Sequence, residues 1–246
     1  MRVVALGGGS GTSAVLGLTN LGYDLSLIVS VVDDGGSSGK LLESNPQLIP
    51  PGDIRKPAVL SSRRFQNKEI FENRFGNIPI PREYNLKDIL GYHTYCSEMI
   101  EILKPYGILN IPLNINNLNG HNIGNLILSA LMLKFGNTEG IRIFLEILDC
   151  PVEILPSAEK HSKFYFMARN STRPDVGENL LDDFERSAEP ITNCWLDPEV
   201  QAYKLCLDRI DNADVVLISP TSIYANIVST LLIPGYREIL NDKKII

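Results

Sequence analysis

Residues 3–13 of the chain read VVALGGGSGTS, and this stretch decides the fold. Its first four residues form a short continuous apolar run, which is typical of a strand buried on both faces of a parallel sheet. A glycine-rich turn follows, and residues 12–21 then carry apolar side chains at helical spacing. The apolar run at residues 25–32 predicts a second strand. Strand, turn, helix and strand in this order predict a βαβ unit with a right-handed connection.

The same alternation continues along the chain and predicts an open α/β sheet with short links. We expect further strands at residues 151–155, 163–168 and 215–218, and helices at residues 88–103, 120–135, 138–148 and from about 222 through 232. Residues 197–199 (Asp-Pro-Glu) predict a further helix start, because an acid at the N-cap and proline at the first position are common there. By composition, residues 33–40 and 50–56 are expected to be loops.

Length, net charge and cysteine spacing exclude several classes of protein. The 246 residues predict one domain, with a lid region at residues 61–84 and a polar excursion at residues 156–196. The net charge of −6 argues against a nucleic-acid partner. Four scattered cysteines without Cys-x-x-Cys spacing argue against a disulfide framework or a zinc site. Neither a signal peptide nor an apolar run of about 20 residues is present, so we expect a cytoplasmic protein without a membrane span.

The glycine-rich turn is the first candidate binding site. Gly9, Gly11 and Ala14 fit the G-x-G-x-x-G/A spacing of loops that let the backbone approach a phosphate closely. The alternative is a tight turn that needs glycine for its backbone alone. Consecutive glycines next to two hydroxyl side chains favour phosphate binding, and the candidate residues are Gly8, Gly9, Ser10, Gly11 and Thr12.

A second candidate, residues 33–40, reads DDGGSSGK and follows the second predicted strand. Asp33 and Asp34 are placed to hold a ribose hydroxyl or a magnesium-bound diphosphate, since magnesium takes one or two carboxylates plus phosphate oxygens. An N-cap and a turn acid would explain one aspartate. We assign Asp34 as the candidate magnesium ligand and catalytic residue. Ser37 and Ser38 would contact the same ligand.

Three further segments carry candidate residues. Arg55, two positions after Asp53, could bind a phosphate with its forked guanidinium, but an N-cap at Asp53 with a solvated Arg55 is an equal alternative. His121 and Asn125 lie at i and i+4 in the segment NGHNIGN, and we favour a ligand-facing helix N-terminus over a capped buried one. Ser222 and Tyr224 follow the apolar run at 215–218.

Residues 7–13, 33–40 and 219–224 each follow a predicted strand. Open α/β sheets bind ligands in the crevice at the carboxyl ends of their strands. The three segments therefore predict one shared site for a small phosphorylated ligand.

Taken together, these motifs resemble the gluconeogenesis factor (YvcK-like) branch of the CofD-like superfamily, whose other branch contains the 2-phospho-L-lactate transferases. The segments that carry the resemblance are VALGGGSG at 4–11, VVDDGGSSG at 31–39, PPGDIR at 50–55, GHNIGN at 120–125 and residues 219–224. The resemblance implies a Rossmann-like three-layer fold, with an open, mostly parallel sheet, helices on both faces and a small inserted sub-lobe.

The resemblance also implies a function. Members of this branch are linked to cell shape during growth on gluconeogenic carbon sources and are reported to bind UDP-sugars. The transferases move a phospholactyl group from a guanosine diphosphate donor, with magnesium. On this basis the glycine loop, Asp33, Asp34, Ser37, Ser38 and Arg55 would line a nucleotide or diphosphate site, and His121 and Asn125 would border it.

The chain departs from the family in two places. It has Ser219 and Thr221 where relatives usually have glycine, and relatives continue past residue 246 into another strand, so we expect a C-terminus that is short or truncated. The main interpretation is a nucleotide-binding regulator. A phospholactyl-type transferase is one alternative and an NAD(P)-dependent dehydrogenase is another. Self-association is left open.

Overall fold

The computed structural model describes the chain apart from residues 33–34, 77–83, 93–96, 116, 170, 178–179 and 182–189. Its centre is a four-stranded parallel sheet in the order β5-β2-β1-β9. The strands are β1 (Arg2–Leu6), β2 (Asp24–Val29), β5 (Glu153–Pro156) and β9 (Val215–Ile218). Near the C-terminus, Ile245 forms a parallel bridge with Val216 on the outer side of β9.

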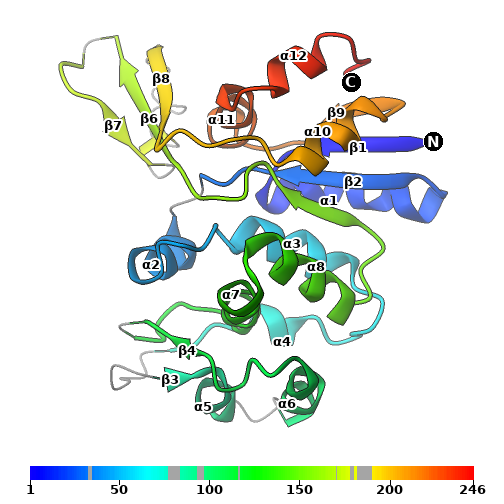
Figure 1. Ribbon diagram of the computed structural model, residues 1–246, viewed down its shortest axis with the longest axis vertical. Helices are drawn as coiled ribbons and strands as arrows, with labels where there is room; N and C mark the ends of the chain where they lie inside the picture. The colour runs from blue at the N-terminus through cyan, green and yellow to red at the C-terminus, as the bar shows by residue number, and fades with distance from the viewer. Residues whose placement is uncertain are drawn as a thin grey trace.

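This order defines the fold class. Counted along the chain, the parallel strands lie in the spatial order third, second, first, fourth, which is the order of a Rossmann-type sheet. The order reverses between β1 and β9, so the chain leaves these two neighbouring strands in opposite directions. The fold is therefore the Rossmann-like, mostly parallel α/β fold expected from the sequence, with helices flanking the sheet (Figure 1).

The connection from β1 to β2 is only partly α-helical. It consists of a 3₁₀ turn η1 (Gly9–Thr12), a single α-helical turn α1 (Ser13–Leu16) and a second 3₁₀ turn η2 (Gly17–Leu21). Gly22 ends it with a left-handed backbone at φ 80°, a common conformation for glycine at a helix C-terminus. The predicted βαβ unit is therefore present, with a tighter helix than expected.

The connection from β2 to β5 contains most of the helices. Its long core helix α7 (Ile123–Phe135) is buried on all sides over its first ten residues. Helices α3 and α8 pack against β5, and the remaining elements fill the lower part of Figure 1. In chain order they are α2 (Gly36–Ser44), α3 (Gly52–Ser61), α4 (Glu69–Glu72), β3 (Tyr84–Asn85), α5 (Leu86–Gly91), α6 (Ser97–Leu103), η3 (Lys104–Tyr106), β4 (Pro112–Leu113), α7 and α8 (Asn137–Ile147).

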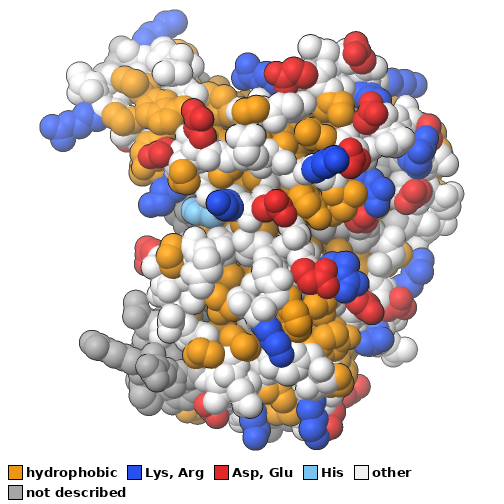
Figure 2. Space-filling model, in the orientation of Figure 1, with side chains coloured by type: hydrophobic (Ala, Val, Ile, Leu, Met, Phe, Trp, Pro, Cys, Tyr) orange, Lys and Arg blue, Asp and Glu red, His pale blue; other side chains and the backbone are white. Residues whose placement is uncertain are grey.

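The connection from β5 to β9 contains a second, antiparallel sheet in the order β7-β6-β8. Its strands are β6 (Lys163–Ala168), β7 (Asp175–Val176) and β8 (Ile191–Asp197). Phe164 and Phe166 point into the core, whereas Tyr165 stacks on Trp195 on the opposite face, with ring centroids 5.7 Å apart. Figure 2 shows hydrophobic side chains gathered over this sheet.

Four helices complete the chain. They are α10 (Lys204–Asp211) before β9, and η4 (Ile223–Val228, a π-helical turn), α11 (Ser229–Leu232) and α12 (Tyr236–Leu240) after it. Within the described part of the chain, no helix combines the length and the apolar character needed to cross a bilayer.

Three predictions from local sequence were wrong. Residues 36–40 and 52–56 are helical, as the starts of α2 and α3, rather than loops. Prolines at 50 and 51 suggested a loop, but they precede the helix, where a missing N–H costs nothing. Conversely, the predicted helix start at residues 197–199 does not exist. Asp197 ends β8, the Asp197–Pro198 peptide is cis, and the helix begins only at Lys204.

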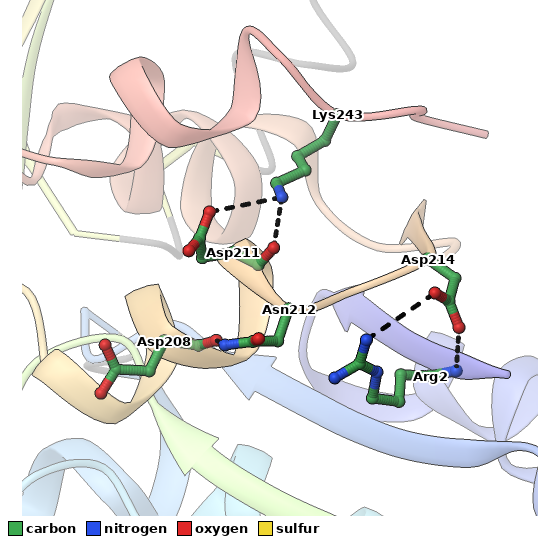
Figure 3. A network of polar contacts seen from close by, with 6 residues as sticks. All are labelled: Arg2, Asp208, Asp211, Asn212, Asp214 and Lys243. Atoms are coloured by element: carbon green, nitrogen blue, oxygen red, sulfur yellow. Dashed lines mark hydrogen bonds and ion pairs between the residues drawn. The ribbon is translucent and has the colours of Figure 1, made fainter.

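A network of hydrogen bonds and ion pairs lies at the amino end of β1 (Figure 3). The backbone N–H of Arg2 donates to Asp214 at 2.7 Å, and the two side chains form a long ion pair of 4.0 Å. Lys243 donates to the backbone and the carboxylate of Asp211. These contacts tie the end of α10 to β1 and to the C-terminal segment, at the end of the sheet opposite the glycine loop.

Candidate functional site

The glycine loop and the segment after β9 meet at the point where the strand order reverses. The hydroxyl of Thr221 accepts from the N–H of Gly8 at 3.3 Å and donates to its carbonyl at 3.2 Å. The hydroxyl of Ser219 donates to the carbonyl of Leu6 at 3.0 Å. Two segments more than 200 residues apart are thus joined at the crevice where open α/β sheets bind ligands.

The glycines of this loop are required by protein packing. A Cβ atom added to Gly11 would lie 1.3 Å from the carbonyl oxygen of Pro220. A Cβ added to Gly8 would lie 2.2 Å from a carboxylate oxygen of Asp53 and 2.4 Å from Oδ1 of Asn226. Real Cβ atoms do not approach other atoms so closely. The atoms met at Gly11 are backbone, so a side chain is excluded there, whereas at Gly8 the ends of the Asp53 and Asn226 side chains would have to move. Packing against the segment after β9 accounts for Gly11 without a phosphate, whereas the tight-turn alternative applies at Gly9, whose φ is positive.

Thr12 stabilises the loop from inside. Its side chain is fully buried, and its hydroxyl donates to the carbonyl of Gly9 at 2.8 Å. Gly9 itself has a left-handed backbone at φ 62°, which favours glycine. Ser10 lies between them in η1. The hydroxyl of Thr12 therefore holds the turn in shape.

Helix α3 places Asp53 and Arg55 in different surroundings. The carboxylate of Asp53 lies beside Gly8 and Gly9. Arg55 is buried, with 4% of its surface exposed, and forms an ion pair with Glu72 of α4. The N-cap of α3 is Pro51, so the expected alternative of a capping Asp53 and a solvated Arg55 is wrong. A buried guanidinium needs a charged partner, and Glu72 supplies one.

Arg55 is also part of a polar chain across four helices. Its Nε donates to Oδ1 of Asn125 at 2.9 Å, and Nδ2 of Asn125 donates to the hydroxyl of Ser37 at 3.0 Å. The arginine stem crosses α7 at Gly124, where an added Cβ would lie 2.6 Å from its Cδ. Glu72, Arg55, Asn125 and Ser37 therefore join α4, α3, α7 and α2, and the second glycine of GHNIGN is needed for that crossing.

The turn that precedes α7 holds a buried histidine. His121 is 1% exposed, and burial together with the positive charges of Lys40 and Arg74 lowers its pKa to about 4. Among the described residues, neither Nδ1 of His121 nor Nδ2 of the fully buried Asn122 has a hydrogen-bond partner. The side-chain oxygen of Asn122 caps α7 by accepting from the N–H of Asn125 at 2.8 Å. At neutral pH this turn therefore carries a neutral imidazole between two cations.

The other candidate residues differ in how deeply they are buried and in what they contact. Ser38 is buried in α2, Ser222 caps η4 by accepting from the N–H of Ala225, and Tyr224 is half-buried. Asp33 and Asp34 lie outside the described residues, so the magnesium and catalytic assignment of Asp34 remains a prediction. Among the residues that the structure does describe, no three His, Cys, Asp or Glu side chains gather as they would around a metal ion.

Sequence reasoning missed several residues that the structure brings to this region. Thr221 and Asn226 contact the glycine loop, Glu72 neutralises Arg55, and Lys40 and Arg74 flank His121. Asn122 stood inside a recognised motif and could have been read as the helix cap. Glu72 and Arg74 carry no local signal, because they lie in a segment whose pattern is weak.

The fold and this crevice define a Rossmann-like α/β protein with a glycine loop at its topological switch point. The chain belongs to the family described as 2-phospho-L-lactate transferase CofD, whose model matches residues 3–246.

Several proteins similar to this chain are named gluconeogenesis factors, which form one branch of this family. The chain is 28% identical over 245 residues to the gluconeogenesis factor of Halalkalibacterium halodurans and 29% identical over 241 residues to that of Bacillus subtilis. The two alignments include 98% and 96% of this chain, but the chain spans only 63% of the length of either relative. A crystal structure of a UPF0052 family member from Bacillus halodurans has a TM-score of 0.76 and 26% identity, covering 99% of this chain and 66% of that one.

Proposed function

We propose that this chain is the nucleotide-binding part of a regulatory protein of the gluconeogenesis-factor type, which binds a UDP-sugar or a related nucleotide in the cytoplasm. Its role would be to support cell shape during growth on gluconeogenic carbon sources. The observation that carries the proposal is the contact between Gly8 and Thr221 at the switch point between β1 and β9, since ligands of open α/β sheets bind there. The names of the similar proteins supply the biological context.

The ligand would lie over the carboxyl ends of β1 and β9, beside the glycine loop. Asp53 and Asn226 lie against the loop, and the half-buried hydroxyl of Ser37 accepts a hydrogen bond from the buried Asn125. Asp33 and Asp34 follow β2 in the chain, and in this proposal they hold magnesium on the diphosphate. Magnesium would neutralise the phosphate charge, while the protein groups orient the nucleotide.

A thermal-shift and calorimetric screen tests this proposal. The protein is exposed to UDP-sugars, UDP, GDP and NAD(H), each with and without magnesium. A ligand at 100 times its Kd stabilises the fold by about 2.7 kcal/mol. We expect uridine nucleotides to stabilise the protein. Stabilisation by NAD(H) alone, or by no nucleotide, would contradict the proposal, whereas GDP with magnesium alone would favour the transferase.

Asp34→Asn gives the matching test of the magnesium assignment. It should weaken nucleotide binding mainly when magnesium is present, because a metal ligand is lost. Asp24→Asn is the control, since Asp24 lies at the opposite end of β2, is exposed, and changes the net charge equally. If the Asp34 and Asp24 variants bind the nucleotide with equal affinity in the presence of magnesium, Asp34 is not a ligand of the metal.

A further inference from the structure

The turn at residues 118–122 is approached from two sides by cations. Lys40, on α2, donates through Nζ to the carbonyl of Asn119 at 3.4 Å. Arg74, in the segment after α4, donates through Nη1 to the carbonyl of Gly120 at 2.5 Å. Both contacts are made to neutral oxygens. Among the described residues, no carboxylate lies within ion-pair distance of either cation.

The position of this turn is held by backbone contacts. Gly120 has φ 80°, and the N–H of His121 donates to the carbonyl of Leu118 at 3.0 Å. The N–H of Gly120 donates to Phe75 at 3.0 Å, and the N–H of Phe75 donates back to His121 at 2.9 Å. The segment carrying Arg74 is thus fixed against the turn as a short antiparallel pair. The two cations therefore belong to one preformed surface.

Two buried side chains behind this surface have unused hydrogen-bonding capacity. His121 and Asn122 are at most 1% exposed, and Nδ1 of His121 and Nδ2 of Asn122 have no partner in the part of the chain that the structure describes. An unsatisfied buried polar atom costs about 1–3 kcal/mol, so native structures rarely keep one without a reason. The oxygen of Asn122 is already used by Asn125, so its unused Nδ2 can only donate, as can both cations, and His121 donates when Nδ1 carries its proton. Two positive charges next to these donors favour an acceptor that carries negative charge.

We propose that Lys40, Arg74, His121 and Asn122 form a phosphoryl-binding subsite at the turn that precedes α7. The subsite lies on a different turn from the glycine loop. It takes a doubly charged phosphoryl group because two cations converge on it, and no described residue gives either of them an acidic partner. The group can belong to the nucleotide ligand or to a separate phosphorylated molecule. The proposal deepens the proposed function but does not depend on it, because inorganic phosphate alone is sufficient to test it.

Inorganic phosphate is therefore the probe, titrated into the full chain at constant ionic strength and followed by calorimetry and by the NMR signal of the His121 ring. We expect Lys40→Gln and Arg74→Gln each to weaken phosphate binding by about tenfold, the usual effect of losing one charge-assisted hydrogen bond. Lys87→Gln and Arg173→Gln remove the same charges at exposed positions elsewhere. They should leave the affinity within about twofold, because exposed charges are screened by salt.

The NMR signal separates a local from a general charge effect. The charged groups of the described residues that act on His121 are Lys40 from α2 and Arg74 from the segment after α4, and both lower its pKa. A bound dianion would oppose them, so phosphate should raise the pKa of His121 from about 4. Equal loss of affinity in the Lys87 and Arg173 controls, or a His121 signal that phosphate leaves unchanged, would overturn the subsite.

Nucleotide binding is measured on the same variants to separate the two proposals. If nucleotides bind the wild-type chain while phosphate does not perturb His121, the subsite is wrong and the proposed function stands. If phosphate binds through Lys40 and Arg74 while no nucleotide binds, the subsite stands and the proposed function fails.

Discussion

Arg55 on α3 and Asn125 on α7 are joined inside the protein by a hydrogen bond of 2.9 Å between Nε and Oδ1. The same guanidinium reaches Glu72 on α4, and the same amide reaches Ser37 on α2. Four helices from the long connection between β2 and β5 therefore share one polar chain. This chain positions the Ser37 hydroxyl and the first turn of α7 relative to the sheet.

Removing the charge of Glu72 should destabilise the protein. Glu72→Gln leaves the Arg55 charge buried without a full counter-charge, and we expect a loss of about 1–3 kcal/mol in the free energy of unfolding. The loss should be smaller than for a fully buried pair, because Glu72 is 42% exposed and water reaches it. Glu69→Gln, on the same helix but exposed, is the control. Urea unfolding measures both, and equal losses would refute a special role for Glu72.

Gly11 and Gly17 should respond oppositely to the same substitution. Gly11→Ala forces a Cβ against the carbonyl of Pro220, so we expect a loss of about 1–3 kcal/mol or more from overpacking. Gly17→Ala meets nothing within 4 Å and keeps a right-handed helical backbone, so it should be neutral or stabilising by up to about 1 kcal/mol. Urea unfolding of both variants decides the point, and a stable Gly11→Ala protein would contradict the packing.

This prediction changes how glycine variants of the loop must be interpreted. A bulky residue at Gly11, such as Gly11→Val, is expected to disturb the contact between the loop and the segment after β9. Lost ligand binding in that variant would then report a displaced loop as much as a blocked phosphate site.

Burial of neutral His121 should make stability depend on pH. Its pKa is about 4 in the folded protein and 6.5 when unperturbed. Between these values the unfolded chain binds a proton that the folded chain does not, so the free energy of unfolding falls as pH falls from 6.5 to 4. The full difference amounts to about 3 kcal/mol.

The His121 contribution is isolated by comparing unfolding of the wild type and His121→Gln across this pH range, because carboxylates titrate in both proteins. The two stabilities should converge or cross as pH falls, with the wild type losing more. Parallel curves would show that His121 titrates normally when folded.

The stacked pair Tyr165 and Trp195 should stabilise the β7-β6-β8 sheet. These residues are direct cross-strand partners, and aromatic pairs of this kind contribute about 0.5–1.5 kcal/mol beyond burial. Tyr165→Ala should therefore lower stability, while Asn193→Ala, exposed on the same strand as Trp195, should change it little. Trp195 is the single tryptophan of the chain, so its fluorescence reports this sheet directly. Identical fluorescence transitions in the two variants would argue against the pair.

Local sequence determined the elements of the central sheet. The apolar runs at 3–6 and 215–218 became β1 and β9. β1 is buried from Val3 to Leu6, as expected for a central parallel strand, whereas β9 buries Val216 and leaves Ile218 exposed. The glycine-rich turn and the two segments at the strand ends were also recognised from the sequence. Turns and helix caps depend on residues that are neighbours in the chain, so local sequence is sufficient to find them. The alternation of strands and helices predicted an open α/β sheet, and the family resemblance implied its Rossmann-like form.

Tertiary structure alone decided what these residues contact. Composition predicted a loop at residues 52–56, yet packing of α3 against β5 and the glycine loop makes the segment helical and buries Arg55. The partner of Arg55 is Glu72, and the partners of the glycine loop are Asp53, Asn226 and Thr221. Periodicity records which face of an element is apolar, but it carries no information about which distant side chain will meet a buried charge. That choice depends on how the helices pack, which only the folded chain defines.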